Sequence, residues 1–183
     1  MTTGPLAFDL TLQRRSKPVR TSQAAAKIKA RNANADRGKE AEAAVAKALA
    51  AWQKMISQTR EVNRLLDTRA AGRVVRSAAA DFEFFSGVDI KTHGLIEVKS
   101  TAHDYRLSRN KVPQLPRLIK RSHCGGLCGV LVYHTGTRMW RAIPVSWLES
   151  RPEVPSWDLR DLDQWSTAQA ALNALDPAFF VVD

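Results

Sequence analysis

The chain has 183 residues, with 28 Lys and Arg against 18 Asp and Glu, and a formal net charge of +10. We expect one domain with its own core and no membrane partner, because no apolar run approaches the roughly 18 residues of a transmembrane helix. The two cysteines exclude a disulfide scaffold, and no secretory signal is recognisable, so we expect a cytoplasmic protein. A pI near 10.1 favours a polyanionic partner, most often nucleic acid.

The charge is unevenly distributed along the chain. Residues 1–35 carry seven basic groups and one acid, whereas residues 151–183 carry two basic and six acidic groups. We therefore predict a flexible basic arm over 1–35 with a nascent helix over 24–30, a domain over 36–150, and an acidic extension over 151–183 that packs on the domain. The arm would either contact phosphates or only increase solubility.

The domain is predicted to begin with a helix that follows residues 36–38. Apolar residues recur at helical spacing from Ala41 to Trp52 and give this helix one apolar face. The next stretch, 53–72, is polar and rich in arginine, with a possible helix around 61–68. Residues 73–76 then read as a short strand.

The remaining elements predict a mixed sheet. Residues 81–85 and 95–100 alternate as strands, with a turn over 88–94 that ends at Gly94. A basic stretch over 104–112 precedes a helix over 114–121, and the apolar run 129–134 pairs with 138–143 as a hairpin. The resulting order is αβββαββ, and the predicted fold class is α/β with a mixed central β-sheet flanked by helices.

Three charged residues on the first two long strands carry the chemical signal. Glu97 and Lys99 share one face of a strand, because side chains alternate with a period of two. Asp81 begins the neighbouring strand and can lie beside them. Carboxylates that share a site repel each other unless a cation is present, and hard oxygen ligands suit Mg²⁺ or Mn²⁺. A hydrophobic core does not need this arrangement.

Further motifs accompany these three residues in a fixed order. They are Arg37-Gly38-Lys39-Glu40-Ala41-Glu42, Val74-Val75-Arg76-Ser77, Ala80-Asp81-Phe82, Ile96-Glu97-Val98-Lys99, Gly125-Gly126 and Val130-Leu131-Val132. Over about residues 36–147 this set resembles the PD-(D/E)xK nuclease superfamily, and within it the archaeal-type and RecU-type Holliday-junction resolvases. The resemblance implies a restriction-endonuclease-like core and a metal-dependent, structure-selective endonuclease. Such an enzyme resolves four-way junctions as a homodimer by paired phosphodiester hydrolysis.

The resemblance also implies a set of site residues. Asp81, Glu97 and the backbone carbonyl of Val98 would bind Mg²⁺, with Mn²⁺ as a substitute, and Lys99 would activate the attacking water. A glutamate on the first helix, four residues after a glycine, completes the metal site in this family. That position is Glu42, with Glu40 as the alternative. The two glutamates point to different sides of a helix, so only one can join the site.

Two features depart from the family pattern. RecU-type proteins carry hydroxyl residues before the aspartate, where this chain has Ala78-Ala79-Ala80. The 16-residue spacing between Asp81 and Glu97 is also somewhat long for a hairpin. Asp89 lies inside this hairpin as an alternative ligand, although its neighbours lack strand alternation and favour a turn.

Several polar residues are candidates for DNA contact. Gln114 begins the helix after the Glu97 strand, where related nucleases use a glutamine near the water or the scissile phosphate; a helix-surface role is the alternative. Ser100 could donate a hydrogen bond to a phosphate oxygen. Basic residues beside the site would contact the DNA backbone, namely Arg76, Arg106, Arg109, Lys111, Arg117, Lys120 and Arg121.

Other interpretations are weighed against this one. His123, Cys124, Cys128 and His134 do not have the spacing of a usual zinc site. The expected partner is branched DNA, with no small-molecule cofactor, in the nucleoid or, for a viral gene, in the host cytoplasm. The competing functions are a restriction-like or repair nuclease on duplex, flap or single-stranded DNA, and a catalytically silent DNA-binding architectural protein.

Overall fold

The computed structural model describes residues 20–56, 58–65, 78–87, 92–103, 105–151 and 154–176. The chain separates into two compact units, Met1–Ala33 and Asn34–Asp183. In the first unit the described residues are helical from Arg20 onward. All strands of the described residues lie in the second unit.

The first helix, α1, spans Arg20–Met55. The prediction that residues 36–38 precede the helix is therefore wrong, because they lie inside it. The flanking Ala, Lys, Arg and Glu are strong helix formers, and the segment contains no proline, so helix propagates through Asp36 and Gly38. The interior glycine has a close neighbour, since a Cβ on Gly38 would lie 3.9 Å from Oγ of Ser100.

Five strands form the main sheet in the order β1-β2-β3-β5-β6. Their bounds are Arg60–Arg64 for β1, Phe82–Ser86 for β2, Thr92–Thr101 for β3, Leu127–His134 for β5 and Met139–Pro144 for β6. β3 and β5 pair in parallel, and the other three pairs are antiparallel. The parallel pair requires a crossover, which helix α2 (Leu115–His123) provides.

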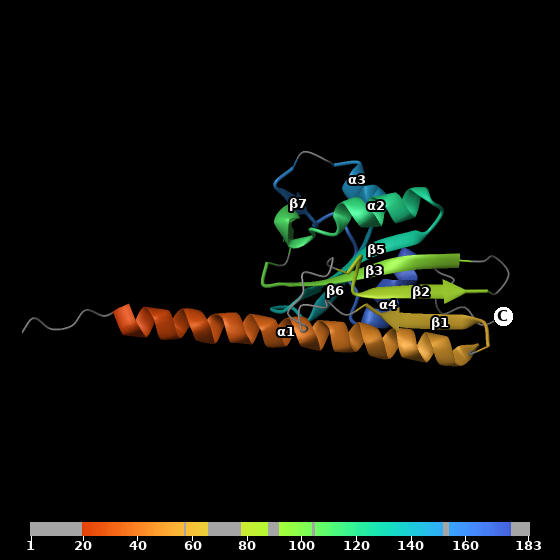
Figure 1. Cartoon of the computed structure of the whole chain (residues 1–183). Helices are drawn as coiled ribbons and strands as arrows, with labels where there is room; N and C mark the ends of the chain where they lie inside the picture. The colour runs from red at the N-terminus through yellow and green to blue at the C-terminus, as the bar shows by residue number, and fades with distance from the viewer. Residues whose placement is uncertain are drawn as a thin grey trace, which may run out of the picture. The chain divides into compact units, whose positions relative to one another are not determined.

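Helices cover both faces of this sheet, as Figure 1 shows for α2 and α3 (Val145–Glu149) on one side. A first core cluster joins the sheet to α1 and to α4 (Ala168–Leu175), and it includes Leu49, Ile96 and Leu172. A second cluster joins the other face to α2 and α3, and it includes Leu95 and Leu118. Consecutive residues Leu95 and Ile96 thus belong to opposite clusters, as expected for a strand buried on both faces.

The predicted mixed sheet and its flanking helices are confirmed, and the strands of the main sheet follow α1 and α2 in the predicted order αβββαββ. The first strand, however, is not where we expected it. The predicted helix over 61–68 is wrong, because Arg60–Arg64 pairs with β2 as an antiparallel strand. Val62 packs on the first core cluster while Glu61 and Asn63 are exposed, so burial of one side chain and pairing outweigh local preference. The predicted strand over 73–76 lies outside the described residues.

Gly94 also differs from expectation. It was predicted to end a turn, but it lies within β3 and pairs with Leu127 of β5. A Cβ at this position would lie 1.9 Å from the carbonyl oxygen of Leu127. The parallel strands can approach here only because residue 94 has no side chain.

The remaining elements lie outside the main sheet. The basic stretch after β3 forms β4 (Arg106–Ser108) and a 3₁₀ turn, η2 (Arg109–Lys111). β4 pairs with β7 (Ser156–Asp158) in a separate two-stranded sheet. Among the described residues, no helix combines the length and the apolar character needed to cross a membrane.

Candidate active site

Antiparallel pairing of β2 and β3 brings Asp81 next to Glu97. Phe82 is the register partner of Ile96, so the residue before Phe82 faces the residue after Ile96 across the pair. The N–H of Val98 donates a hydrogen bond of 2.7 Å to Oδ2 of Asp81 and fixes this carboxylate to β3. The structure thus places Asp81 beside the strand that carries Glu97 and Lys99.

Glu97 is fully buried and is paired with Lys99. Nζ of Lys99 contacts Oε1 of Glu97, and the lysine side chain is 21% exposed. In the described part of the chain, no group donates a hydrogen bond to Oε2 of Glu97. Burial raises the pKa of Glu97 to about 7, although the positive charge of Lys99 opposes this shift. The site therefore holds a carboxylate whose charge is incompletely compensated.

Asp81 is half-buried and belongs to the same electrostatic group. Burial raises its pKa, while the hydrogen bond from Val98 and the charge of Lys99 act in the opposite direction. The negative charge of Glu42 raises it further. Asp81 and Glu97 also repel each other, and this repulsion contributes to the raised pKa of Glu97. Such mutual repulsion is relieved when a cation lies between the carboxylates.

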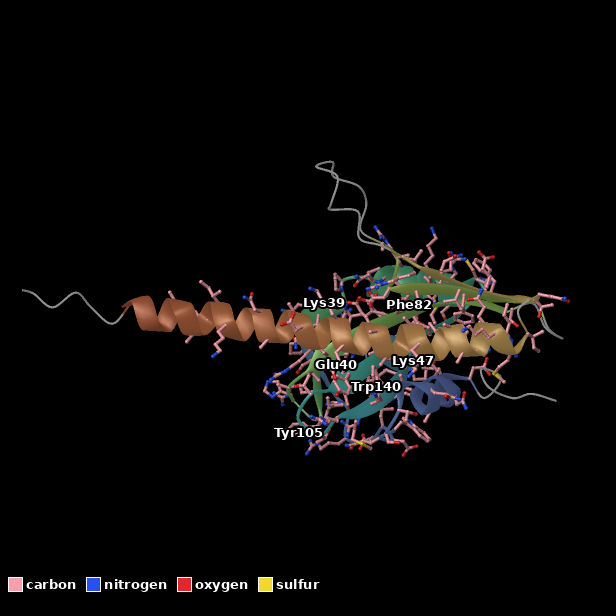
Figure 2. The ribbon with its side chains drawn as sticks, turned by 90° about the horizontal axis from the view of Figure 1, so that it is seen from below. Lys39, Glu40, Lys47, Phe82, Tyr105 and Trp140 are labelled. Atoms are coloured by element: carbon pink, nitrogen blue, oxygen red, sulfur yellow. The ribbon has the colours of Figure 1, made fainter. Side chains whose placement is uncertain are left out.

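The third carboxylate comes from α1. Ala41 of α1 is buried in the first core cluster. The next residue, Glu42, lies at the edge of the buried face of this helix, and its side chain is 30% exposed. Glu42 lines the same cavity as Asp81, whereas Glu40 is exposed and does not line it. Figure 2 looks onto α1 and labels Glu40 on the helix. The geometry favours Glu42 over Glu40 as the helical member of the site.

Gln114 lies at the N-terminal cap of α2 and reaches the same cavity. Its Oε1 atom is buried and has no hydrogen-bond partner among the described residues. An unpaired buried amide oxygen is costly, so this atom is suited to receive a hydrogen bond from a bound water or ligand. Burial of this atom favours a role in the cavity over the alternative of simple helix-surface polarity.

These residues surround one cavity of about 270 Å³. Glu97 is not among its lining residues, but it pairs with Lys99, which is. The cavity combines carboxylates, cations and an amide with a few apolar side chains, so it has the polar character of a site for ions and water. Its lining residues are Glu42, Arg64, Leu65, Ala78, Ala80, Asp81, Lys99 and Gln114.

The donor set fits a hard divalent cation. The unpaired oxygen of Glu97 and the two further carboxylates of Asp81 and Glu42 are oxygen ligands of the kind that Mg²⁺ and Mn²⁺ prefer. In the described part of the chain, no three His, Cys, Asp or Glu side chains are already gathered closely enough to hold a metal ion. The side chains of Lys99 and Arg64 instead pair with Glu97 and Glu42. A metal ion would have to draw these carboxylates together.

Arg64 is the cavity residue that the sequence analysis missed. It had been assigned to an arginine-rich segment with a possible helix, and only the strand register places it across from Phe82, next to Asp81. Its Nη2 atom lies 2.5 Å from Oε2 of Glu42. No local sequence signal distinguishes Arg64 from its arginine neighbours before β1 is recognised.

The described members of the predicted DNA-contacting set lie on β3, β4, η2 and α2. Arg106 and Lys111 are exposed, and Arg109 lies over the ring of Trp157. On α2, Lys120 is exposed and Arg117 donates a hydrogen bond of 3.2 Å to the carbonyl of Ala78, which lines the cavity.

Three further residues complete this set. Arg121 pairs with Glu83 at 3.1 Å, and half-buried Ser100 lies next to Gly38. Arg76, like the alternative ligand Asp89, lies outside the described residues. The carbonyl of Val98 stays a predicted ligand.

The residues weighed for zinc have other partners. His123 pairs with Glu149 at 2.9 Å, and His134 is buried with its Nδ1 atom 2.9 Å from the carbonyl of His103. Cys128 is buried in the second core cluster, while Cys124 is exposed. The described residues thus offer no zinc cluster here.

Comparison with known proteins finds matches among solved structures. The chain is similar in structure to the Holliday junction resolvase Hjc of the archaeal hyperthermophile Archaeoglobus fulgidus, with a TM-score of 0.41 and 18% sequence identity. The similarity covers 73% of this chain and 99% of that one. No protein-family model and no curated protein sequence matches the chain.

Proposed function

We propose that this chain is a divalent-metal-dependent endonuclease that cuts branched DNA, with the four-way junction as its substrate. The observation that carries this proposal is the convergence of residues from four elements on one cavity. Asp81, Lys99 and Gln114 line it together with Glu42 of α1, and Glu97 pairs with Lys99. This combination of carboxylates, ammonium and buried amide matches the needs of phosphodiester hydrolysis.

The metal would be held by Asp81, Glu97 and Glu42, with the carbonyl of Val98 as a further ligand. Mg²⁺, or Mn²⁺ in its place, would polarise the phosphate and stabilise charge in the transition state. The hydrogen bond from Val98 holds Asp81 in place for this role.

Lys99 and Gln114 would act on the attacking water. The ammonium of Lys99 would orient this water and, through its positive charge, favour loss of a proton from the water to solvent. The unpaired Oε1 of Gln114 would accept a hydrogen bond from the same water. Neither group needs to move far, because both already line the cavity.

Exposed basic side chains, one of which contacts the cavity lining, support DNA as the substrate. Arg106, Lys111, Arg117 and Lys120 are exposed, and Arg117 contacts a cavity residue through its guanidinium. Contacts with phosphates would supply an affinity that falls with salt. The choice of a four-way junction and of a homodimer rests on the family resemblance, because two sites related by a two-fold axis fit a two-fold symmetric substrate.

Cleavage of a labelled four-way junction tests the proposal. The full-length protein is incubated with the junction or with a linear duplex made of its arms, in Mg²⁺ or in EDTA. We expect paired nicks on opposing strands of the junction, in Mg²⁺ alone. Equal cutting of the duplex would instead indicate a general nuclease. Binding of the junction without cutting in either Mg²⁺ or Mn²⁺ would indicate an architectural DNA-binding protein.

A further inference from the structure

Arg64, the last residue of β1, occupies a position at the candidate active site that no part of the proposed chemistry uses. Its Nη2 atom lies 2.5 Å from Oε2 of Glu42, and both side chains line the cavity with Asp81 and Lys99. The charge of Arg64 also acts on Asp81, where it lowers the pKa of the carboxyl. This arginine is therefore part of the charge balance of the site.

The two ion pairs of the site differ in how readily they can exchange. Glu97 is 0% exposed and Lys99 is 21% exposed, so that pair is largely withdrawn from solvent. Arg64 and Glu42 are 51% and 30% exposed. Ion pairs open to solvent are weak because water and dissolved ions compete with them. Of the two pairs, Arg64–Glu42 is the one that an incoming cation can separate.

We infer that Arg64 is an internal counter-ion of the metal site: it holds Glu42 in the metal-free protein, and a divalent cation displaces it. The released guanidinium stays at the cavity, where it can bind a phosphate oxygen of the DNA. A guanidinium binds phosphate through two parallel hydrogen bonds, which an ammonium cannot do. This inference rests on the metal centre of the proposed function.

Binding of Mn²⁺ alone tests the counter-ion role without any catalytic readout. The electron paramagnetic resonance signal of unbound Mn²⁺ measures the affinity of Mn²⁺ for the wild type and for Arg64→Gln. The control variant is Arg138→Gln, because Arg138 is exposed in the turn between β5 and β6. Removal of the competing cation should tighten Mn²⁺ binding about fivefold in Arg64→Gln, since an exposed ion pair has about this strength. Arg138→Gln should bind as the wild type does.

A second comparison locates the effect. In a Glu42→Gln background, Arg64→Gln should change Mn²⁺ affinity much less, because the competing pair is already broken and only the charge effect of Arg64 on Asp81 remains. In Ca²⁺, Arg64→Gln should weaken binding of the uncleaved junction about tenfold relative to the wild type. In EDTA the change should be much smaller, because Glu42 still holds the guanidinium of the wild type away from the DNA.

The outcomes separate the two proposals. Equal Mn²⁺ affinity in the wild type and in Arg64→Gln, or a gain of the same size in the Glu42→Gln background, would overturn the counter-ion role and leave the metal centre intact. Equal losses of junction affinity in Ca²⁺ and EDTA would overturn the displacement step. If none of the proteins binds Mn²⁺, the metal centre of the proposed function fails, and the inference fails with it.

Discussion

The N–H of Val98 donates a hydrogen bond of 2.7 Å to Oδ2 of Asp81, so the strand that carries Glu97 and Lys99 also fixes the third charged residue beside them. The last register pair of β2 and β3 is Phe82 with Ile96, so this N–H lies beyond the pairing of the two strands. The contact explains how a residue just outside β2 is held in place. It also offsets part of the rise in the pKa of Asp81 that burial causes.

Replacement of Glu97 by Gln should abolish cleavage and preserve junction binding. The substitution removes a carboxylate ligand and breaks the ion pair with Lys99, but it keeps the shape of the buried side chain. We expect the cleavage rate to fall at least about 100-fold, the lower end of what a positioned catalytic group contributes. Single-turnover cleavage and gel-shift assays measure the two effects. Cleavage at the wild-type rate would remove Glu97 from the mechanism.

The two glutamates of α1 form a matched pair for mutagenesis. Glu42 lines the cavity, whereas Glu40 is exposed on the same helix and does not. Glu42→Gln should reduce the cleavage rate about 100-fold, and Glu40→Gln should leave it within about twofold of the wild type. The free energy of unfolding should change by less than about 1 kcal/mol in both variants, because the ion pair of Glu42 is exposed to solvent. The reverse order of effects would reassign the metal ligand to Glu40.

Stability should depend on the protonation of Glu97. Its pKa is raised from 4.5 to about 7 in the folded state, so the folded protein keeps a proton that the unfolded chain loses first. The bound proton contributes up to about 3 kcal/mol to the free energy of unfolding. This stabilisation is fully present below about pH 4.5 and is lost as the pH rises through 7. Denaturation in EDTA at pH 5 and pH 8 should show a larger loss for the wild type than for Glu97→Gln. Identical losses would contradict the raised pKa.

Lys120 should contribute to DNA affinity through phosphate contact. Lys120→Gln should weaken junction binding and reduce the slope of log K against log salt by about 0.9, the value for one phosphate contact. Arg138→Gln serves as the control, since it removes an exposed cation from the turn between β5 and β6. Fluorescence anisotropy between 50 and 200 mM salt, a range chosen to span the steep part of the curve, gives both slopes. An unchanged slope in Lys120→Gln would place Lys120 outside the interface.

Gly94 should be intolerant of any side chain. In Gly94→Ala the new Cβ would meet the carbonyl of Leu127 at 1.9 Å, which forces β3 and β5 apart. We expect a loss of stability of more than about 3 kcal/mol, as for severe overpacking. Gly87→Ala is the matched control, because its Cβ would lie 3.6 Å from the carbonyl of Thr59. Chemical denaturation compares the two, and a small effect at residue 94 would contradict the close approach of the strands.

The sequence alone determined the long elements of the fold. The apolar run that became β5, the hairpin to β6 and the helix after Pro113 were all recognisable, because burial on both faces or on one helical stripe leaves a strong periodic pattern. The face shared by Glu97 and Lys99 also followed from the period of a strand. That Asp81 lies close to Glu97 and Lys99 could be predicted because the two strands that carry these residues are adjacent.

Other features were decided only by tertiary structure. Arg60–Arg64 is a strand because β2 offers it a pairing edge. This cause is not visible in a short window of sequence. The same holds for the cavity, where Arg64, Glu42 and Gln114 meet from three elements distant in the chain. Long-range packing brings these side chains together and sets their charge balance. Local periodicity in the sequence does not predict such contacts.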